Sequence, residues 1–152
     1  MSLDLGIVGN GTIAGLINAR GDYEWFCLPR FDGEPVFNKL LGGGGSFSVW
    51  MEGLSKRTQS YDRNTAILRT RMESEDGAIL EIVDFAPRFE RKGRTFRPVS
   101  LVRRFEVIAG TPQLKISLTP ETDWGGRRLK PIRGVNHVRF VDEEFSFRVT
   151  TD

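Results

Sequence analysis

The stretch "QLKISLTP" (residues 113–120) decides the fold class, because apolar and polar side chains alternate along it. Leu114, Ile116 and Leu118 fall on one face of an extended chain, and the polar residues between them fall on the other. A period of two is typical of a β-strand with one buried face and one solvated face. The stretch therefore predicts a half-buried strand.

The same alternation recurs in "NHVRFV" (136–141) and "EFSFRVTT" (144–151). Two further apolar runs, 64–74 and 77–87, flank the turn Asp76-Gly77, and glycine tolerates the positive φ that such a turn requires. We therefore expect a hairpin there.

Two connections and one helix complete the expected elements. The runs 100–110 and 113–118 are joined across Gly110-Thr111-Pro112, which predicts another hairpin. "GEPVFNKLLGG" (33–43) predicts one short helix over 35–41, with Pro35 at its first position and Gly42 just past its end. Roughly eight or more short strands with almost no helix predict an all-β, antiparallel sandwich or barrel.

Composition narrows the function classes. The length of 152 residues suggests one domain, 1–152, and the net charge of +2 argues against a nucleic-acid or membrane partner. The only histidine is His137 and the only cysteine is Cys27, so neither a zinc site nor an intrachain disulfide is expected, and no cofactor motif is present. Without a secretory signal or an apolar run of membrane-spanning length, a cytoplasmic location is expected.

No catalytic residue is assigned from the sequence. "GNGTIAG" (9–15) lacks the strand–turn–helix context of a phosphate loop, and His137 lies in an alternating strand with no nucleophile to serve. Paired carboxylates could serve glycoside hydrolysis, which needs two of them across the scissile bond. The candidates are Asp32, Glu34, Asp84 and Asp123, and each is equally typical of a turn or cap.

The aromatic and basic side chains offer a second possibility. Trp25, Trp50 and Trp124 are candidates for sugar stacking, although burial in the core is the commoner role of tryptophan in β proteins. The arginine pairs 103–104 and 127–128 are interpreted as solvated faces.

The order of the segments is more informative than any one of them. The stretches "GIVGNGTIAGLINARGDYEWFCLPRFDGEPVFNKLLG" (6–42), "YDRNTAILRTRMESEDGAILEIVDFAPRF" (61–89) and "LVRRFEVIAGTPQLKISLTPETDWG" (101–125) follow one another in the chain. Together they resemble the N-terminal region of bacterial and archaeal glycoside hydrolase family 15 enzymes, the glucoamylase and trehalase-like group. The chain departs from the pattern at Phe26, where an aliphatic residue is usual, and at Trp124, where tyrosine is usual.

The resemblance implies a part of an enzyme. Members of that family carry an N-terminal antiparallel β-sandwich of the supersandwich type, a linker, and a catalytic (α/α)6 barrel that holds the acid and base glutamates. This chain would be the sandwich, an N-terminal fragment without the barrel, and would not hydrolyse α-glucosidic bonds alone. Its parent would be an inverting, glucoamylase-like hydrolase, and the barrel would be the partner of this domain.

The resemblance also points to residues 30–32 within "CLPRFD" as candidates for a domain interface or substrate rim. Arg30 would offer a bidentate fork to a carboxylate or sugar hydroxyl, Phe31 would be an apolar anchor, and Asp32 would cap the following turn.

Two alternatives remain open. The chain could be a free-standing carbohydrate-binding module that holds α-glucosides on Trp25, Trp50 or Trp124. It could also be a structural domain that self-associates as a homodimer through an exposed edge or apolar patch.

Overall fold

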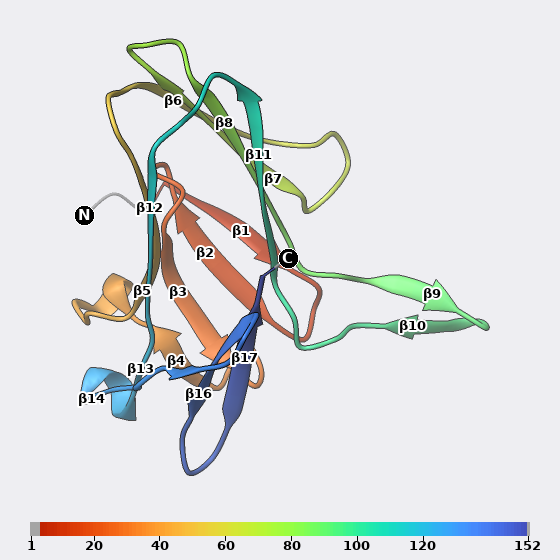
Figure 1. Cartoon of the computed structure of the whole chain (residues 1–152). Coiled ribbons are helices and arrows are strands. Elements are labelled where there is room, and N and C mark those ends of the chain that lie inside the picture. The colour runs from red at the N-terminus through yellow and green to blue at the C-terminus, as the bar shows by residue number, and fades with distance from the viewer. Residues whose placement is uncertain (1–3, 152) are drawn as a thin grey trace.

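The computed structural model describes residues 4–151, and its regular secondary structure is almost entirely antiparallel strand (Figure 1). The first large sheet has the order β1-β2-β3-β5-β12, with β4 paired to β3. Its strands are β1 (Leu5–Gly9), β2 (Ala14–Asn18), β3 (Tyr23–Leu28), β4 (Glu34–Phe37), β5 (Ser46–Met51) and β12 (Leu114–Thr119).

The second large sheet has the order β11-β8-β7-β6. Its strands are β6 (Leu54–Tyr61), β7 (Leu68–Ser74), β8 (Ile79–Phe85) and β11 (Val102–Ala109). The two sheets pack face to face, which confirms the all-β antiparallel sandwich expected from the sequence.

Smaller elements surround the sandwich. There are two two-stranded sheets among the described residues. One pairs β9 (Phe89–Arg91) with β10 (Arg94–Phe96), and the other pairs β13 (Glu121–Thr122) with β14 (Arg127–Arg128). A three-stranded sheet contains β15 (Ile132–Arg133), β16 (His137–Val141) and β17 (Ser146–Thr150). Single 3-10 turns lie at η1 (Lys39–Leu41) and η2 (Asp123–Gly125).

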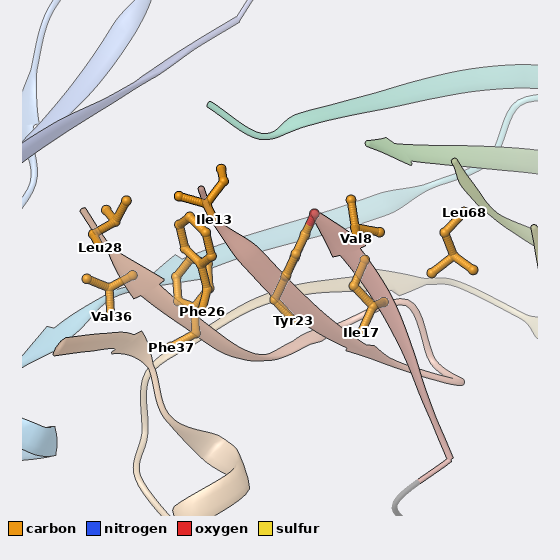
Figure 2. Close-up of a cluster of buried hydrophobic side chains, with 9 residues drawn as sticks. All are labelled: Val8, Ile13, Ile17, Tyr23, Phe26, Leu28, Val36, Phe37 and Leu68. Atoms are coloured by element: carbon orange, nitrogen blue, oxygen red, sulfur yellow. The ribbon is translucent and has the colours of Figure 1, made fainter. Parts of the chain in front are cut away.

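The core lies between the two large sheets. One cluster gathers the inward side chains of β1 to β4 against Leu68 of β7, and Figure 2 shows Leu68 reaching across from the second sheet. Phe147 of β17 and Phe145, which lies just before that strand, pack against this cluster. A second cluster joins β5 to β7 and β8 through Met51, Met72 and Leu80.

Strand β7 forms within the predicted run 64–74, and its residues are buried and partly buried in strict turn from Leu68 to Ser74. The hairpin from β7 to β8 is also confirmed. Gly77 takes a φ of 84° at its turn, a conformation that a side chain would strain.

The predicted helix over 35–41 is wrong. Residues Glu34–Phe37 form strand β4 on the edge of β3, and only Lys39–Leu41 make one 3-10 turn, which Gly42 ends with a φ of 85°. Val36 and Phe37 are buried in the core, and pairing with β3 delivers them there. Burial in the core thus overrides the local signals for a helix. Of those signals only Gly42 acts as expected, because it ends the 3-10 turn.

The predicted hairpin across Gly110-Thr111-Pro112 is also wrong. Strand β11 pairs with β8 in the second sheet, whereas β12 pairs with β5 in the first. The connection therefore crosses from one layer of the sandwich to the other, which Figure 1 shows at its upper end.

Candidate functional site

The loop after β3 presents the predicted residues Arg30, Phe31 and Asp32 on the surface. The guanidinium of Arg30 forks onto the carboxylate of Asp32, with Nε–Oδ1 at 3.0 Å and Nη2–Oδ2 at 3.1 Å. The Phe31 ring is 53% exposed, while its amide donates to the carbonyl of Thr12 at 3.0 Å. The loop is thus fastened to the β1–β2 turn and exposes an aromatic ring and an ion pair.

The expectation that Asp32 caps the following segment is not met, because its carboxylate accepts from Arg30 in place of a backbone amide. Both side chains are more than half exposed, so the pair contributes little to stability. Within this chain, the Arg30 guanidinium that the resemblance assigned to a partner is paired with Asp32, two residues away.

Cys27 lies on β3 next to this loop and is 2% exposed. Burial raises the pKa of its thiol, which disfavours the reactive thiolate. Cys27 therefore occupies its position as a small buried apolar residue.

The three tryptophans do not form a common platform. Tyr23 of β3 pairs with Phe47 of β5, so Trp25 and Trp50 lie on opposite sides of that pair, about 17 Å apart along the strands. Trp25 is partly buried, whereas Trp50 is 56% exposed. Trp124 belongs to neither strand and lies in η2.

The η2 turn presents Trp124 in an uncommon backbone conformation. Asp123, Trp124 and Gly125 take φ values of 55°, 51° and 94°, so three successive residues lie in the left-handed region. Such conformations cost of order 1–2 kcal/mol for a residue with a side chain. The Trp124 ring is 67% exposed, and its amide donates to Glu34 Oε1 at 3.0 Å.

A buried polar network supports that turn. Glu121 Oε2 accepts from Asn38 Nδ2 at 3.1 Å and from the Gly44 amide at 3.0 Å. Asn38 Oδ1 accepts from the Gly45 amide at 2.8 Å. Asn38 and Glu121 are 2% and 8% exposed, so their contacts hold the glycine-rich segment after η1 against β13.

The neighbouring carboxylates are also engaged. The Thr122 hydroxyl lies 2.6 Å from Asp142 Oδ2 and 3.2 Å from Glu34 Oε1, and Arg127 pairs with Asp142. These two contacts, with Thr122 the stronger, lower the pKa of Asp142. Asp142 is thus held ionised and hydrogen-bonded, as a structural anion.

Sequence reasoning missed a buried ion pair between the sheets. Arg103 Nε and Nη2 donate to the two oxygens of Asp84 at 2.8 Å and 3.0 Å, and the side chains are 4% and 0% exposed. The guanidinium carbon lies 4.7 Å from the ring centres of both Tyr23 and Phe47, and Nη2 also donates to the carbonyl of Gly21. The interpretation of Arg103 as part of a solvated face is therefore wrong.

The alternation of β11 contained a signal for this pair. Arg103 lies two residues before Phe105, which packs on the second core cluster, and Asp84 lies two residues after the buried Ile82. Residues two apart on a strand share a face, so Arg103 and Asp84 lie on the inner face with Phe105 and Ile82. Burial, and then the nearby Asp84 charge, raise the pKa of Tyr23 well above its usual value, so its hydroxyl stays protonated. The charges of Arg103 and Asp84 cancel, and the three side chains together link the two layers of the sandwich.

Three of the four weighed carboxylates have partners inside the chain, whereas Asp123 is exposed in η2. Asp84 is buried against Arg103, Glu34 is bonded to Trp124, and Asp32 is bonded to Arg30. A cavity of about 320 Å³ between Leu28, Val99 and Phe147 has no acidic residue in its lining. Glycoside hydrolysis requires two carboxyl groups across a substrate-sized space, and the lining of this cavity supplies none.

Within residues 4–151, no three histidine, cysteine, aspartate or glutamate side chains are grouped as metal ligands. The ring of His137 contacts Asn136 Oδ1 at 3.2 Å. No helix in the described part of the chain has the length and apolarity needed to cross a membrane.

Comparison with known proteins gives the family of this β-sandwich. The family model described as "Trehalase-like, N-terminal" matches residues 4–147. The chain therefore belongs to the family of trehalase-like N-terminal domains.

Several archaeal trehalases are similar to the chain. Trehalase 1 of Sulfolobus acidocaldarius is 40% identical over 102 residues, which cover 63% of this chain and 18% of the relative. Trehalase 2 of the same organism is 36% identical over 87 residues, or 56% of this chain and 14% of the relative. The trehalase of Thermoplasma volcanium is 28% identical over 151 residues, or 97% of this chain and 22% of the relative.

The chain thus spans about a fifth of the length of the curated relatives it matches. No solved structure shows a significant match to it. The family and the engaged carboxylates together fit a non-catalytic domain of a glycoside hydrolase.

Proposed function

We propose that this chain is the N-terminal supporting domain of a trehalase-like or glucoamylase-like hydrolase of α-glucosidic bonds. The family match over residues 4–147 carries the proposal. Three of the four carboxylates weighed as catalytic, Asp32, Glu34 and Asp84, are engaged inside the domain, which supports a location of the acid and base glutamates in an (α/α)6 barrel elsewhere in the parent. The single domain 1–152 packs on that barrel and stabilises it, in a parent enzyme located in the cytoplasm.

A hydrolysis assay tests the first half of this proposal. The purified 152-residue chain is expected to release no glucose from trehalose or maltose, whereas the full-length parent is expected to release it. Glucose release by the chain alone, at a rate that survives removal of contaminating hydrolases, would show that the catalytic pair lies within it.

Arg30 and Phe31 are the residues through which we propose contact with the barrel or the rim of its substrate pocket. Phe31 offers exposed apolar area beside a charged fork, a pairing typical of the centre and rim of an interface. In the full-length enzyme, Arg30→Ala is expected to lower kcat/KM or the melting temperature, and Arg63→Ala, another exposed arginine, is the matched control. Unchanged kcat/KM and unchanged melting for Arg30→Ala would remove both roles.

Carbohydrate binding is a second candidate, and the η2 turn favours it. Trp124 is 67% exposed on a backbone that costs energy to maintain, and strain of this kind clusters at functional sites. A flat, exposed indole is suited to stack on a pyranose ring. Calorimetry of the chain with maltose, maltooligosaccharides and trehalose is expected to show heat that Trp124→Ala removes, and no heat at millimolar sugar would reject this candidate.

Self-association is a third candidate, favoured by the adjacent ends of the two large sheets. Strands β11 and β12 are the last strands of their sheets, and Val107 and Ile116 are 56% and 50% exposed on them. Unpaired edges with apolar side chains invite strand pairing between copies. Light scattering after size exclusion is expected to give a dimer, and a monomer at high concentration would contradict it.

A further inference from the structure

The hairpin β9–β10 and its flanks form an arm that projects from the sandwich (Figure 1). We define the arm as residues 88–97. Every one of these residues is exposed, so the arm contributes no buried side chain to either core cluster. A two-stranded hairpin with no apolar support is marginally stable in water, so an arm of this kind gains order from something outside the chain.

The arm is nevertheless a well-defined hairpin with a fixed base. Lys92 and Gly93 take φ values of 52° and 69°, as the two central residues of a type I′ turn require. At its base, Asn10 Nδ2 donates to the carbonyls of Pro87 and Pro98 at 2.9 Å and 2.8 Å, and Asn10 is 4% exposed. One buried amide thus holds both ends of the arm and sets its direction.

One face of the arm combines aromatic rings with positive charge. Phe89 and Phe96 are cross-strand partners whose rings stack with centroids 5.5 Å apart, and they are 48% and 42% exposed. Arg91 and Arg94 are partners two positions further along the ladder, beyond the pair Glu90 and Thr95, and side chains two residues apart on a strand share a face. The face therefore presents two rings and two guanidinium groups.

That face is short of negative charge. The arm carries five basic residues and one acidic residue, a net charge of +4 in a chain whose total is +2. The described residues form no ion pair with Arg91 or Arg94. Like charges directly opposite on neighbouring strands are unfavourable, so the pair is best explained by an external anionic surface that it faces.

The arm is also continuous with the loop proposed above to contact the barrel. The Phe31 amide bonds to Thr12, and the neighbouring Asn10 holds the arm, so both features rest on the same β1–β2 turn. Arg97 lies against Gly11 of that turn. One end of the sandwich therefore carries a single extended surface of exposed arginines and phenylalanines.

We infer that the arm docks on an acidic surface of the parent enzyme's catalytic barrel, with Phe89 and Phe96 packed on it and Arg91 and Arg94 paired to its carboxylates. This inference rests on the proposed function. Tethering favours the barrel as occupant, because a small charged contact binds weakly between separate molecules and is greatly strengthened by the millimolar effective concentration within one chain. Arginine pairs bidentately with carboxylates, which matches an acidic protein surface.

Hydrogen exchange followed by mass spectrometry tests the inference. In the full-length parent, amides of residues 88–97 are expected to exchange on the order of tenfold more slowly than in the 152-residue chain. The variant Arg91→Glu/Arg94→Glu is expected to remove that protection in the parent. Salt at about 0.5 M is expected to weaken the protection, because it screens the charges. The variant Lys56→Glu/Lys115→Glu, which changes exposed residues by the same charge, is expected to retain it.

Exchange in β7 and β8 shows that each variant is folded, so loss of arm protection alone reports docking. Equal exchange of the arm in parent and isolated chain would overturn the inference. So would protection that rises with protein concentration, which would indicate a second copy, or an unprotected arm that retains a duplex oligonucleotide. A parent without a catalytic barrel would overturn the proposed function itself, which distinguishes the two failures.

Discussion

Arginine lies beside aromatic rings in two regions of this protein, with opposite consequences. Between the sheets, Arg103 is enclosed by Tyr23 and Phe47 and pairs with Asp84. On the arm, Arg91 and Arg94 lie next to a stacked pair of phenylalanines and form no ion pair with any residue of the range 4–151. The first arrangement is complete within the chain and fixes the two layers, whereas for the second we infer an acidic partner surface.

The largest expected effect comes from breaking the enclosed pair. Arg103→Met leaves the Asp84 carboxylate buried without a counter-charge, and the loss of a buried partner costs about 3–5 kcal/mol of unfolding free energy. Urea denaturation of the chain measures it. The double variant Asp84→Leu/Arg103→Met, which removes both charges, is expected to recover most of the loss; a single-variant cost below about 1 kcal/mol would contradict the role given to the pair.

A smaller loss is expected at the second buried network. Asn38→Ala removes the donor to Glu121 and the acceptor for the Gly45 amide, so buried polar groups lose partners at a cost of about 1–3 kcal/mol. Denaturant midpoints of the variant and of Asn136→Ala, at an exposed asparagine, give the comparison. If the two variants unfold together, the Asn38 contacts do not hold this corner of the fold.

An acid-dependent effect is expected from Asp142. Its folded-state pKa is lowered by Thr122 and Arg127, so its stabilising contribution is present above the unfolded value, about 3.9, and is lost as the pH falls through the folded value. Asp142→Asn should therefore flatten the acid side of the stability profile below about pH 4. Urea midpoints between pH 7 and pH 3 measure this, with Glu143→Gln as the charge-matched control, and identical acid slopes would contradict it.

The smallest effect on stability is expected on the arm. Phe89→Ala removes a half-exposed ring outside the core, and we expect a change within about 0.5 kcal/mol. Phe37→Ala, at a ring that is 4% exposed, should instead cost about 3–5 kcal/mol. Thermal or urea unfolding of both variants sharpens the contrast between the regions, and a large loss at Phe89 would show that the arm supports the sandwich.

Much of the fold follows from local pattern. Residues 68–74 alternate in sequence and in burial, and the Asp76-Gly77 turn returns the chain into β8 as expected. The helix over 35–41 failed because Val36 and Phe37 fill the core from a strand paired with β3. Local terminal signals cannot show where burial is needed.

Among the candidate sites, too, the sequence pointed correctly to some residues and misplaced others. The resemblance pointed to Arg30, Phe31 and Asp32, which the structure places together on an exposed loop, but their proposed contacts require a partner. The interpretation of Arg103 as solvated missed that it shares the inner face of β11 with Phe105. An arginine can lie on the inner face of a strand when a carboxylate pairs with it there, so its charge alone does not place it in solvent.

The sequence by itself determined an antiparallel β-protein, because a period of two and turn glycines are local properties of the chain. The trehalase-like N-terminal family came from the likeness of the ordered segments and from the family match over residues 4–147. Tertiary structure alone decided that β11 and β12 belong to different sheets, that Asp84 meets Arg103, and that the arm stands clear of the core. These outcomes depend on which strands pair and which faces meet. Long-range pairing brings together residues that no local pattern connects.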